Sequence, residues 1–273
     1  MSISSDSIGV WKLDCLKGLL DDFDSTVSKT VAIRDIKLDY DLTNVVLFSA
    51  GKSIVTLQEI ITLCFNGYPD GALSLARNLY EQFIILYFFF KNQNSNKLQE
   101  YLKDYYTNYE IQRQKIQLEY YKVENNADAI QKTQDRLTRL KDSITKNTKG
   151  DYWWADANNF KDLKDKVSQL ETDENSRIIV EHMHLVYRRS SVSIHANCLG
   201  NMNRLCNDAD FWGVDTSPKY KCLSMPLWLA TISFQFVVKA VCDELHIEDY
   251  YSNKLFELSL LYCKKMKTEF NYD

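Results

Sequence analysis

The sequence has little glycine and little proline, with 8 Gly and 3 Pro among 273 residues. Tight turns depend on these residues, so their scarcity argues against a fold with many short strands. Hydrophobic residues make up 45% of the chain, which is enough for a sizeable core. We therefore predict an all-α fold: a multi-helix bundle forming a single domain over residues 1–273.

The chain also lacks a strong charge of one sign and a long apolar run. The net charge of −4 gives no overall positive field of the kind that nucleic-acid-binding proteins often carry. The apolar runs are shorter than the roughly 20 residues of a membrane span, so we expect no membrane segment. The N-terminal residues do not resemble a secretory signal. Seven cysteines without a CxxC pair indicate reduced thiols and a cytoplasmic location.

Motifs for common cofactors and metals are missing as well. The sequence contains no P-loop, GxGxxG or GxSxG, so nucleotide hydrolysis, dinucleotide binding and serine hydrolysis have no support. It contains no HExxH, CxxC or carboxylate cluster either. We therefore expect neither a cofactor nor a metal site.

Hydrophobic periodicity divides most of the chain into helices. We interpret residues 24–40 as a loop with a short helix, and residues 201–221 as the longest irregular stretch, with no strand pair. The aromatic segment Tyr152–Trp154 is interpreted as part of the core rather than as a base-stacking platform. The predicted helices cover residues 8–23, 41–65, 70–91, 173–200, 222–245 and 248–268, with Thr172 or Asp173 capping the fourth and a short helix around Phe160–Val167.

Residues 94–148 differ in character from the rest of the chain. They contain no Gly or Pro and are rich in charges of both signs. We predict a long protruding charged helical hairpin, inserted within the domain, with its bend at residues 125–128. A solvated arm or a coiled-coil dimer contact is the favoured interpretation. A docking site for a protein partner or for nucleic acid is the alternative, and the interleaved charges argue against nucleic acid.

The predicted helix 173–200 contains three of the four histidines. A line of six polar residues runs along it at steps of three or four, the spacing that marks a buried side of a helix. Burying polar groups without partners is costly. Such a line is therefore paired in a structural network, solvated, or part of a functional site. Its members are Arg177, Glu181, His184, Arg188, Ser191 and His195.

A polar pair also interrupts the most apolar predicted helix, residues 70–91. Arg77 and Glu81 lie one turn apart on one side of it. An exposed pair at this spacing stabilises a helix by only about 0.5 kcal/mol. The alternative is that both residues belong to the same polar interior as His195, and the sequence leaves the two interpretations open.

Arg188 and His195 are seven residues apart and lie almost above one another on a continuous helix. Histidine can take a proton from a 2′-hydroxyl or give one to a leaving oxygen. Arginine can hold a phosphate and offset the charge that grows on it. Together they fit metal-independent cleavage of RNA. Arg189 replaces Arg188 if the helix bends near Ser190–Ser193, and a dimer would supply a second copy of each group.

An arginine with a histidine five to seven residues later, on a helix late in an all-α domain, resembles the R-x4-6-H signature of the HEPN superfamily (higher eukaryotes and prokaryotes nucleotide-binding). The wider layout resembles a bacterial HEPN-like family of unknown function. That layout has the segment Gly71–Phe83 (GALSLARNLYEQF), a polar arm and a tryptophan segment, followed by Y-x-x-S and S-x-x-x-H. The last three parts correspond here to Trp153–Trp154, Tyr187 with Ser190, and Ser191 with His195.

The resemblance implies a homodimer that cleaves RNA without a metal, as a toxin or antiviral effector. Active members usually carry Asn, Asp or His directly after the arginine, whereas Arg189 and Ser190 stand at those positions here. The alternative is a non-enzymatic module whose polar residues form a structural network and bind a ligand or partner. The expected catalytic residues are His195, Arg188, Arg189 and Ser191, supported by Arg77, Glu81, Glu181, His184, Tyr187 and Ser190.

Overall fold

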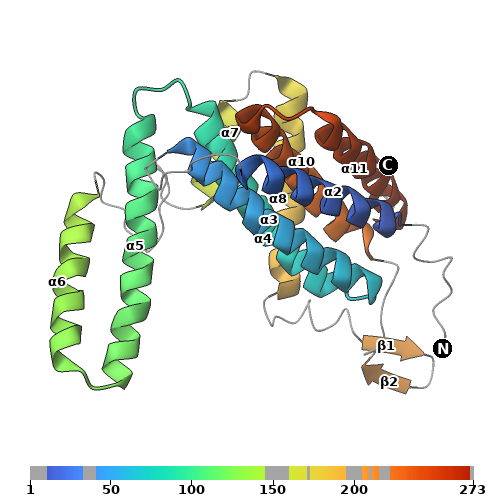
Figure 1. Ribbon diagram of the computed structural model, residues 1–273. Coiled ribbons are helices and arrows are strands. Elements are labelled where there is room, and N and C mark those ends of the chain that lie inside the picture. The colour runs from blue at the N-terminus through green and yellow to red at the C-terminus, as the bar shows by residue number, and fades with distance from the viewer. Residues whose placement is uncertain are drawn as a thin grey trace. The chain divides into compact units, whose positions relative to one another are not determined.

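The computed structural model describes residues 11–32, 41–144, 160–170, 173–194, 205–208, 211–214 and 222–270. Helices make up nearly all of these residues (Figure 1), which confirms the prediction of an all-α multi-helix bundle. The helices are α2 (Leu13–Ala32), α3 (Leu42–Phe65), α4 (Pro69–Lys91), α5 (Leu98–Val123), α6 (Ala127–Ser143), α7 (Phe160–Gln169), α8 (Glu174–Ile194), α10 (Ser224–Leu245) and α11 (Tyr250–Phe270).

The chain divides into two compact units. The first comprises Met1–Lys37, Val45–Leu86 and Glu171–Asp273, and the second comprises Leu38–Asn44 and Tyr87–Leu170. The second unit contains the predicted insertion 94–148. That both units belong to one domain stays a prediction.

Helix α10 lies at the centre of the first unit, and nearly all of its residues are buried. Its Phe234 meets Phe23 of α2 edge to face, with ring centroids 5.8 Å apart. Its Phe236 stacks on Phe83 of α4 at 4.6 Å. Aromatic pairs in these geometries stabilise a core beyond the area that they bury. Contacts from α10 therefore hold both α2 and α4.

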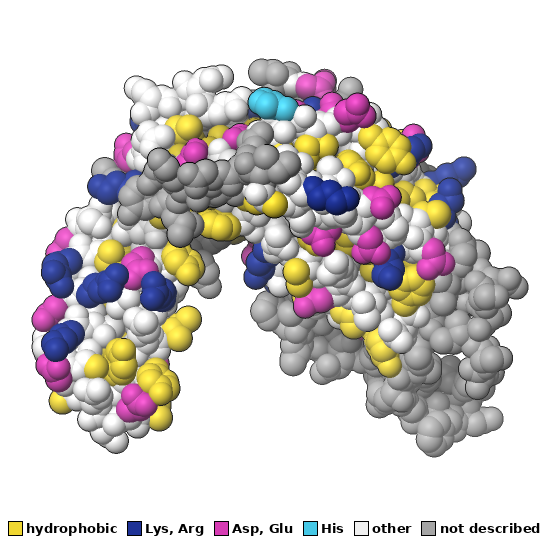
Figure 2. All heavy atoms as spheres, viewed as in Figure 1, with side chains coloured by type: hydrophobic (Ala, Val, Ile, Leu, Met, Phe, Trp, Pro, Cys, Tyr) yellow, Lys and Arg dark blue, Asp and Glu magenta, His cyan; other side chains and the backbone are white. Residues whose placement is uncertain are grey.

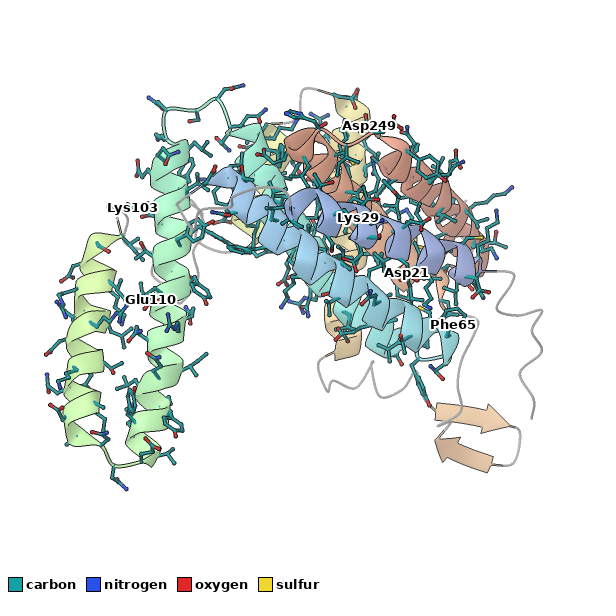
Figure 3. All side chains as sticks on the ribbon, in the orientation of Figure 1. Asp21, Lys29, Phe65, Lys103, Glu110 and Asp249 are labelled. Atoms are coloured by element: carbon teal, nitrogen blue, oxygen red, sulfur yellow. The ribbon has the colours of Figure 1, made fainter. Side chains whose placement is uncertain are left out.

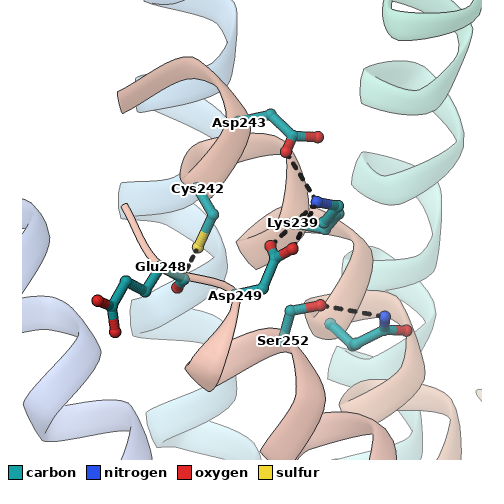
Figure 4. A network of polar contacts seen from close by, with 7 residues as sticks. Lys239, Cys242, Asp243, Glu248, Asp249 and Ser252 are labelled. Carbon is teal, nitrogen blue, oxygen red and sulfur yellow. Dashed lines mark hydrogen bonds and ion pairs between the residues drawn. The ribbon is translucent and has the colours of Figure 1, made fainter. Parts of the chain in front are cut away.

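A compact corner joins α10 to α11 (Figure 4). His246 adopts the left-handed conformation, φ 55° and ψ 43°, and ends α10. Lys239 donates hydrogen bonds to Asp243 at 2.8 Å and to Asp249 at 3.0 Å, so it connects the last turn of α10 to the start of α11. The corner fixes where α11 folds back along α10.

Two local predictions are wrong. Helix α2 continues to Ala32 instead of ending near residue 23. Its polar second half is held by tertiary contacts, because Val27 is buried and the Thr26 hydroxyl lies 2.9 Å from that of Tyr251. The irregular stretch contains an antiparallel strand pair, β1 (Leu205–Asp208) and β2 (Phe211–Val214). The β-prone aromatics of β2 favour a strand despite the polar residues around them.

The predicted helical hairpin is present in the second unit, where α5 and α6 lie side by side (Figure 1). Asn126 caps α6 by accepting a hydrogen bond from the Ala129 amide at 3.1 Å. Glu110 of α5, labelled in Figure 3, forms an ion pair at 2.7 Å with Arg136 of α6. The two helices bury a thin strip between them, which includes Ile111 and Leu137.

Among the described residues, two helices are long and apolar enough to cross a membrane by length and composition alone. They are α3, with a mean hydropathy of 1.3, and α10, with 1.5. In the apolar 18-residue segment of each helix, 83% of the residues are buried in α10 and 50% in α3. The burial of α10 is typical of a core helix in a soluble protein, so its hydropathy is weak support for a membrane span.

Candidate functional site

A polar contact between two helices of the first unit joins α4 to α8 through the phenol of Tyr187. Arg77 Nη2 donates a hydrogen bond to Tyr187 Oη at 2.9 Å. Tyr187 Oη donates in turn to Glu81 Oε1 at 2.9 Å. Arg77 Nε lies 3.3 Å from the same Glu81 oxygen, so each of the three side chains contacts the other two. Arg77 and Glu81 therefore belong to a half-buried polar cluster that they share with α8.

A second contact between α4 and α8 lies beside the first. The Tyr80 side chain is fully buried, and its hydroxyl lies 3.5 Å from His184 Nδ1. The rings of His184 and Tyr187 stack with centroids 5.5 Å apart. We call Arg77, Tyr80, Glu81, His184 and Tyr187 the α4–α8 junction.

The environment of Tyr187 keeps its phenol protonated. Burial, followed by the charge of Glu81 and the hydrogen bond to it, raises the pKa of Tyr187 to about 12, although Arg77 acts in the opposite direction. At neutral pH the phenol therefore remains a hydrogen-bond donor to Glu81. Tyr187 is suited to holding α8 in place and not to taking up a proton.

The predicted line of polar residues on α8 is buried only in part. His184 is 8% exposed, but Arg177, Glu181 and Arg188 are exposed, so the prediction of a buried line is wrong for these three. The buried face of α8 is centred on other residues of the helix, and the line of polar residues runs along the edge of that face. The buried face comprises Val180, Met183, His184, Val186, Tyr187 and Ser190.

Ser190 occupies a supporting position on the buried face of α8. Its side chain is fully buried, and Oγ donates to the carbonyl of Tyr187 at 2.5 Å. A serine that bonds to its own helix in this way leaves no hydroxyl proton for a substrate. The observed role of Ser190 is thus local and structural.

Arg188 is one of the four predicted catalytic residues, and the structure describes its side chain. It follows Tyr187 directly, and successive residues on a helix point about 100° apart. Because α4 holds Tyr187 inward, Arg188 projects outward and is exposed. Within the described part of the chain, Arg188 forms no ion pair.

The side chains of the other three predicted catalytic residues are not among those that the structure describes. His195 lies outside the described residues, as do Trp153 and Trp154. Arg189 and Ser191 lie on the backbone of α8, but their side chains are not among those described. The approach of Arg188 to His195 therefore stays a prediction.

Tyr80 was not predicted as a site residue. The available signal was weak: a tyrosine three residues after Arg77, on a helix that is otherwise apolar. Regarding metals, no group of three His, Cys, Asp or Glu side chains in the described ranges could hold an ion. Five cysteines whose side chains the structure describes are free thiols: Cys15, Cys64, Cys222, Cys242 and Cys263.

Comparison with known proteins gives one match. No curated protein and no solved structure matches the chain. The model of one family, described as "Family of unknown function (DUF5677)", matches residues 43–211, which is more than half of the chain. The matched range includes α4 and α8, and so the whole α4–α8 junction. The protein belongs to this family of unknown function, DUF5677.

Proposed function

We propose that the protein is a metal-independent endoribonuclease of HEPN type. In this proposal it acts as a homodimer in the cytoplasm, as a bacterial antiviral-defence or toxin effector. One observation carries the proposal: the α4–α8 junction holds Tyr187 inward, so the neighbouring Arg188 is presented to solvent on a helix of fixed orientation.

The chemistry assigns a separate task to each group. Arg188, or Arg189 beside it, binds the scissile phosphate and offsets the charge that develops on its oxygens. His195 takes the proton of the 2′-hydroxyl and returns a proton to the 5′-oxygen that leaves. The products are a 2′,3′-cyclic phosphate and a free 5′-hydroxyl. Ser191 lies on α8 between these groups and is proposed to contact the same phosphate.

Two further observations support this assignment. The arginine and histidine spacing resembles the HEPN signature. The exposed side chain of Arg188 leaves its guanidinium available to an anion. The junction residues are not proposed to touch RNA, because the guanidinium of Arg77 is already engaged by Glu81 and Tyr187.

The test is cleavage of a labelled structured RNA pool in the presence of EDTA. We expect wild-type protein to produce fragments with 2′,3′-cyclic phosphate ends, and His195→Ala to produce none. His182→Ala is the matched control, because it removes an exposed histidine from the same helix and is expected to leave cleavage unchanged. Equal cleavage by His195→Ala and wild type would refute the assignment, as would the absence of cleavage by wild-type protein at high concentration.

The same junction also supports a second candidate function. In it the protein is a non-enzymatic helical module, and Arg77, Glu81 and Tyr187 form a purely structural network. Such a module would bind a small ligand, or a protein partner at the 94–148 hairpin. It predicts that Tyr187→Phe lowers the melting temperature. It also predicts that fully folded wild-type protein does not cleave RNA.

A further inference from the structure

An apolar stripe runs along the outer side of α5 in the second unit. Its four side chains are exposed by 65% at Tyr109, 73% at Ile116, 60% at Tyr120 and 82% at Val123. Their spacing of seven, four and three residues places them within one narrow sector of the helix. Figure 2 shows hydrophobic side chains gathered at the end of the hairpin where α5 meets α6. We call these four residues the α5 stripe.

The hairpin does not use the α5 stripe for its own packing. The buried residues of the same stretch, Thr107, Ile111 and Gln114, lie on the opposite side of α5. Helix α6 packs on α5 and contributes the buried residues Thr133 and Leu137. Scattered exposed apolar residues need no explanation, but an aligned row of four large ones on a helix indicates a contact surface.

We propose that the α5 stripe pairs with the α5 stripe of a second copy of this chain, as a parallel two-stranded coiled-coil contact. The first, second and last members of the stripe, Tyr109, Ile116 and Val123, are seven residues apart, which is the repeat of a coiled-coil seam. A second copy carries a stripe of the same length and spacing. In a parallel pair each of these residues meets its own counterpart.

The charges beside the stripe fit a second copy. Arg113 flanks Ile116 on one side and Glu119 on the other, each about 60° away around the helix. Two-fold symmetry of a parallel pair brings Arg113 of one copy and Glu119 of the other to the same side of the seam. Residues 98–143 contain equal numbers of basic and acidic side chains, so two hairpins meet without net repulsion.

The flanking residues can change partners at little cost. Arg113 contacts Glu110 at 3.4 Å, and Glu119 contacts Lys122 at 2.7 Å. Both pairs lie on one helix, and in each the residue that flanks the stripe is exposed, by 56% at Arg113 and 71% at Glu119. Exposed pairs of this kind contribute little to stability. Exchanging them for contacts across the seam therefore does not oppose association.

The size of the stripe predicts a weak association. A standard interface uses roughly 20–30 residues on each side, many more than the four of the stripe. We expect a reversible dimer that dissociates on dilution. The inference rests on the dimer of the proposed function and not on its chemistry, so it is tested by mass and not by cleavage.

The first test measures the mass of the full chain against concentration by sedimentation equilibrium. We expect wild-type protein to pass from monomer to dimer, and Ile116→Glu to remain a monomer with an unchanged circular dichroism spectrum. Val55→Glu is the matched control, because Val55 is 54% exposed on α3 and its replacement is expected to leave the dimer intact.

A second test places the contact directly and does not depend on the first variant. Ile116→Cys and Val123→Cys, each oxidised in the otherwise native chain, are expected to form cross-linked dimers above the level that the native cysteines give. Both sites cross-link to themselves only if the helices are parallel. Cross-linking at position 116 alone would overturn the parallel arrangement.

Three results would overturn the proposal. The first is a wild-type protein that stays monomeric at every concentration while it is fully folded. The second is an Ile116→Glu variant that dimerises like wild type, which would place the contact elsewhere. The third is an Ile116→Glu variant with a lower melting temperature at unchanged mass, which would mean that the stripe packs against its own chain. A wild-type protein that cleaves RNA while it stays monomeric would overturn the dimer and leave the ribonuclease standing.

Discussion

The α4–α8 junction and the α5–α6 hairpin use the same kinds of side chain to different effect. In the junction, the side chains of Arg77 and Glu81 are 23% and 34% exposed and share the phenol of Tyr187. In the hairpin, the pair Lys132 and Asp128 is 75% and 79% exposed and has no third member among the described residues. Ion pairs position helices where a buried group joins them, and elsewhere they mainly keep the surface soluble.

The largest expected difference between the two regions is in stability. Tyr187→Ala removes a buried ring and two hydrogen bonds, so we expect the free energy of unfolding to fall by about 3–5 kcal/mol. Tyr109→Ala removes an exposed ring of the hairpin and is expected to change it by less than about 0.5 kcal/mol. Urea denaturation at low protein concentration, where association does not contribute, measures both. Similar losses in the two variants would contradict the comparison.

The next difference is in activity, if the proposed function holds. Arg188→Ala is expected to reduce RNA cleavage about 100-fold, because a group that stabilises the transition-state phosphate is lost. Arg139→Ala removes an exposed arginine from the hairpin and is expected to leave the rate unchanged. Single-turnover cleavage in EDTA separates the two, with thermal melting as the check on folding. Equal losses would indicate general attraction of RNA to surface charge.

The dependence of stability on pH distinguishes the junction in a third way. The pKa of Tyr187 is raised to about 12 in the folded protein. The folded state therefore holds a proton that the unfolded state releases from about pH 10 upward. We expect stability to fall as pH rises through that window, and to fall less steeply in Tyr187→Phe. Denaturation midpoints between pH 9 and 11 measure this, and identical slopes would contradict the assigned environment.

The smallest expected effect concerns the hairpin. Arg136→Ala breaks the ion pair with Glu110, in which the two side chains are 55% and 19% exposed. We expect a loss of less than about 1 kcal/mol, which high salt reduces further. A loss comparable with that of Tyr187→Ala would mean that Glu110 and Arg136 act as a buried network.

The sequence predicted most of the fold because the helices are long and periodic. Helices α3, α4 and α10 were predicted within a few residues of their observed bounds, since their apolar faces are continuous. The continuation of α2 to Ala32 was missed because it depends on Tyr251, which is distant in sequence. Short elements such as β1 and β2 lack the length over which a period can be recognised.

The candidate site was predicted less completely. The sequence placed His184 and Tyr187 on α8 and left open whether Arg77 and Glu81 join them, because spacing gives the face of a helix and not its partner. It could not show that Tyr187 is the meeting point, since that contact joins residues more than 100 positions apart. The expected burial of Arg177, Glu181 and Arg188 was wrong. Residues along the edge of a buried helix face recur at the same steps of three or four as residues at its centre, so spacing alone does not distinguish them.

The most direct test of the comparison is a pair of double-mutant cycles measured by urea denaturation. One cycle combines Glu81→Gln with Tyr187→Phe in the junction, and the other combines Glu110→Gln with Arg136→Gln in the hairpin. We expect a coupling energy of about 1–2 kcal/mol in the first and less than about 0.5 kcal/mol in the second. A coupling in the junction no larger than that in the hairpin would contradict the view that Tyr187 fixes α8 against α4.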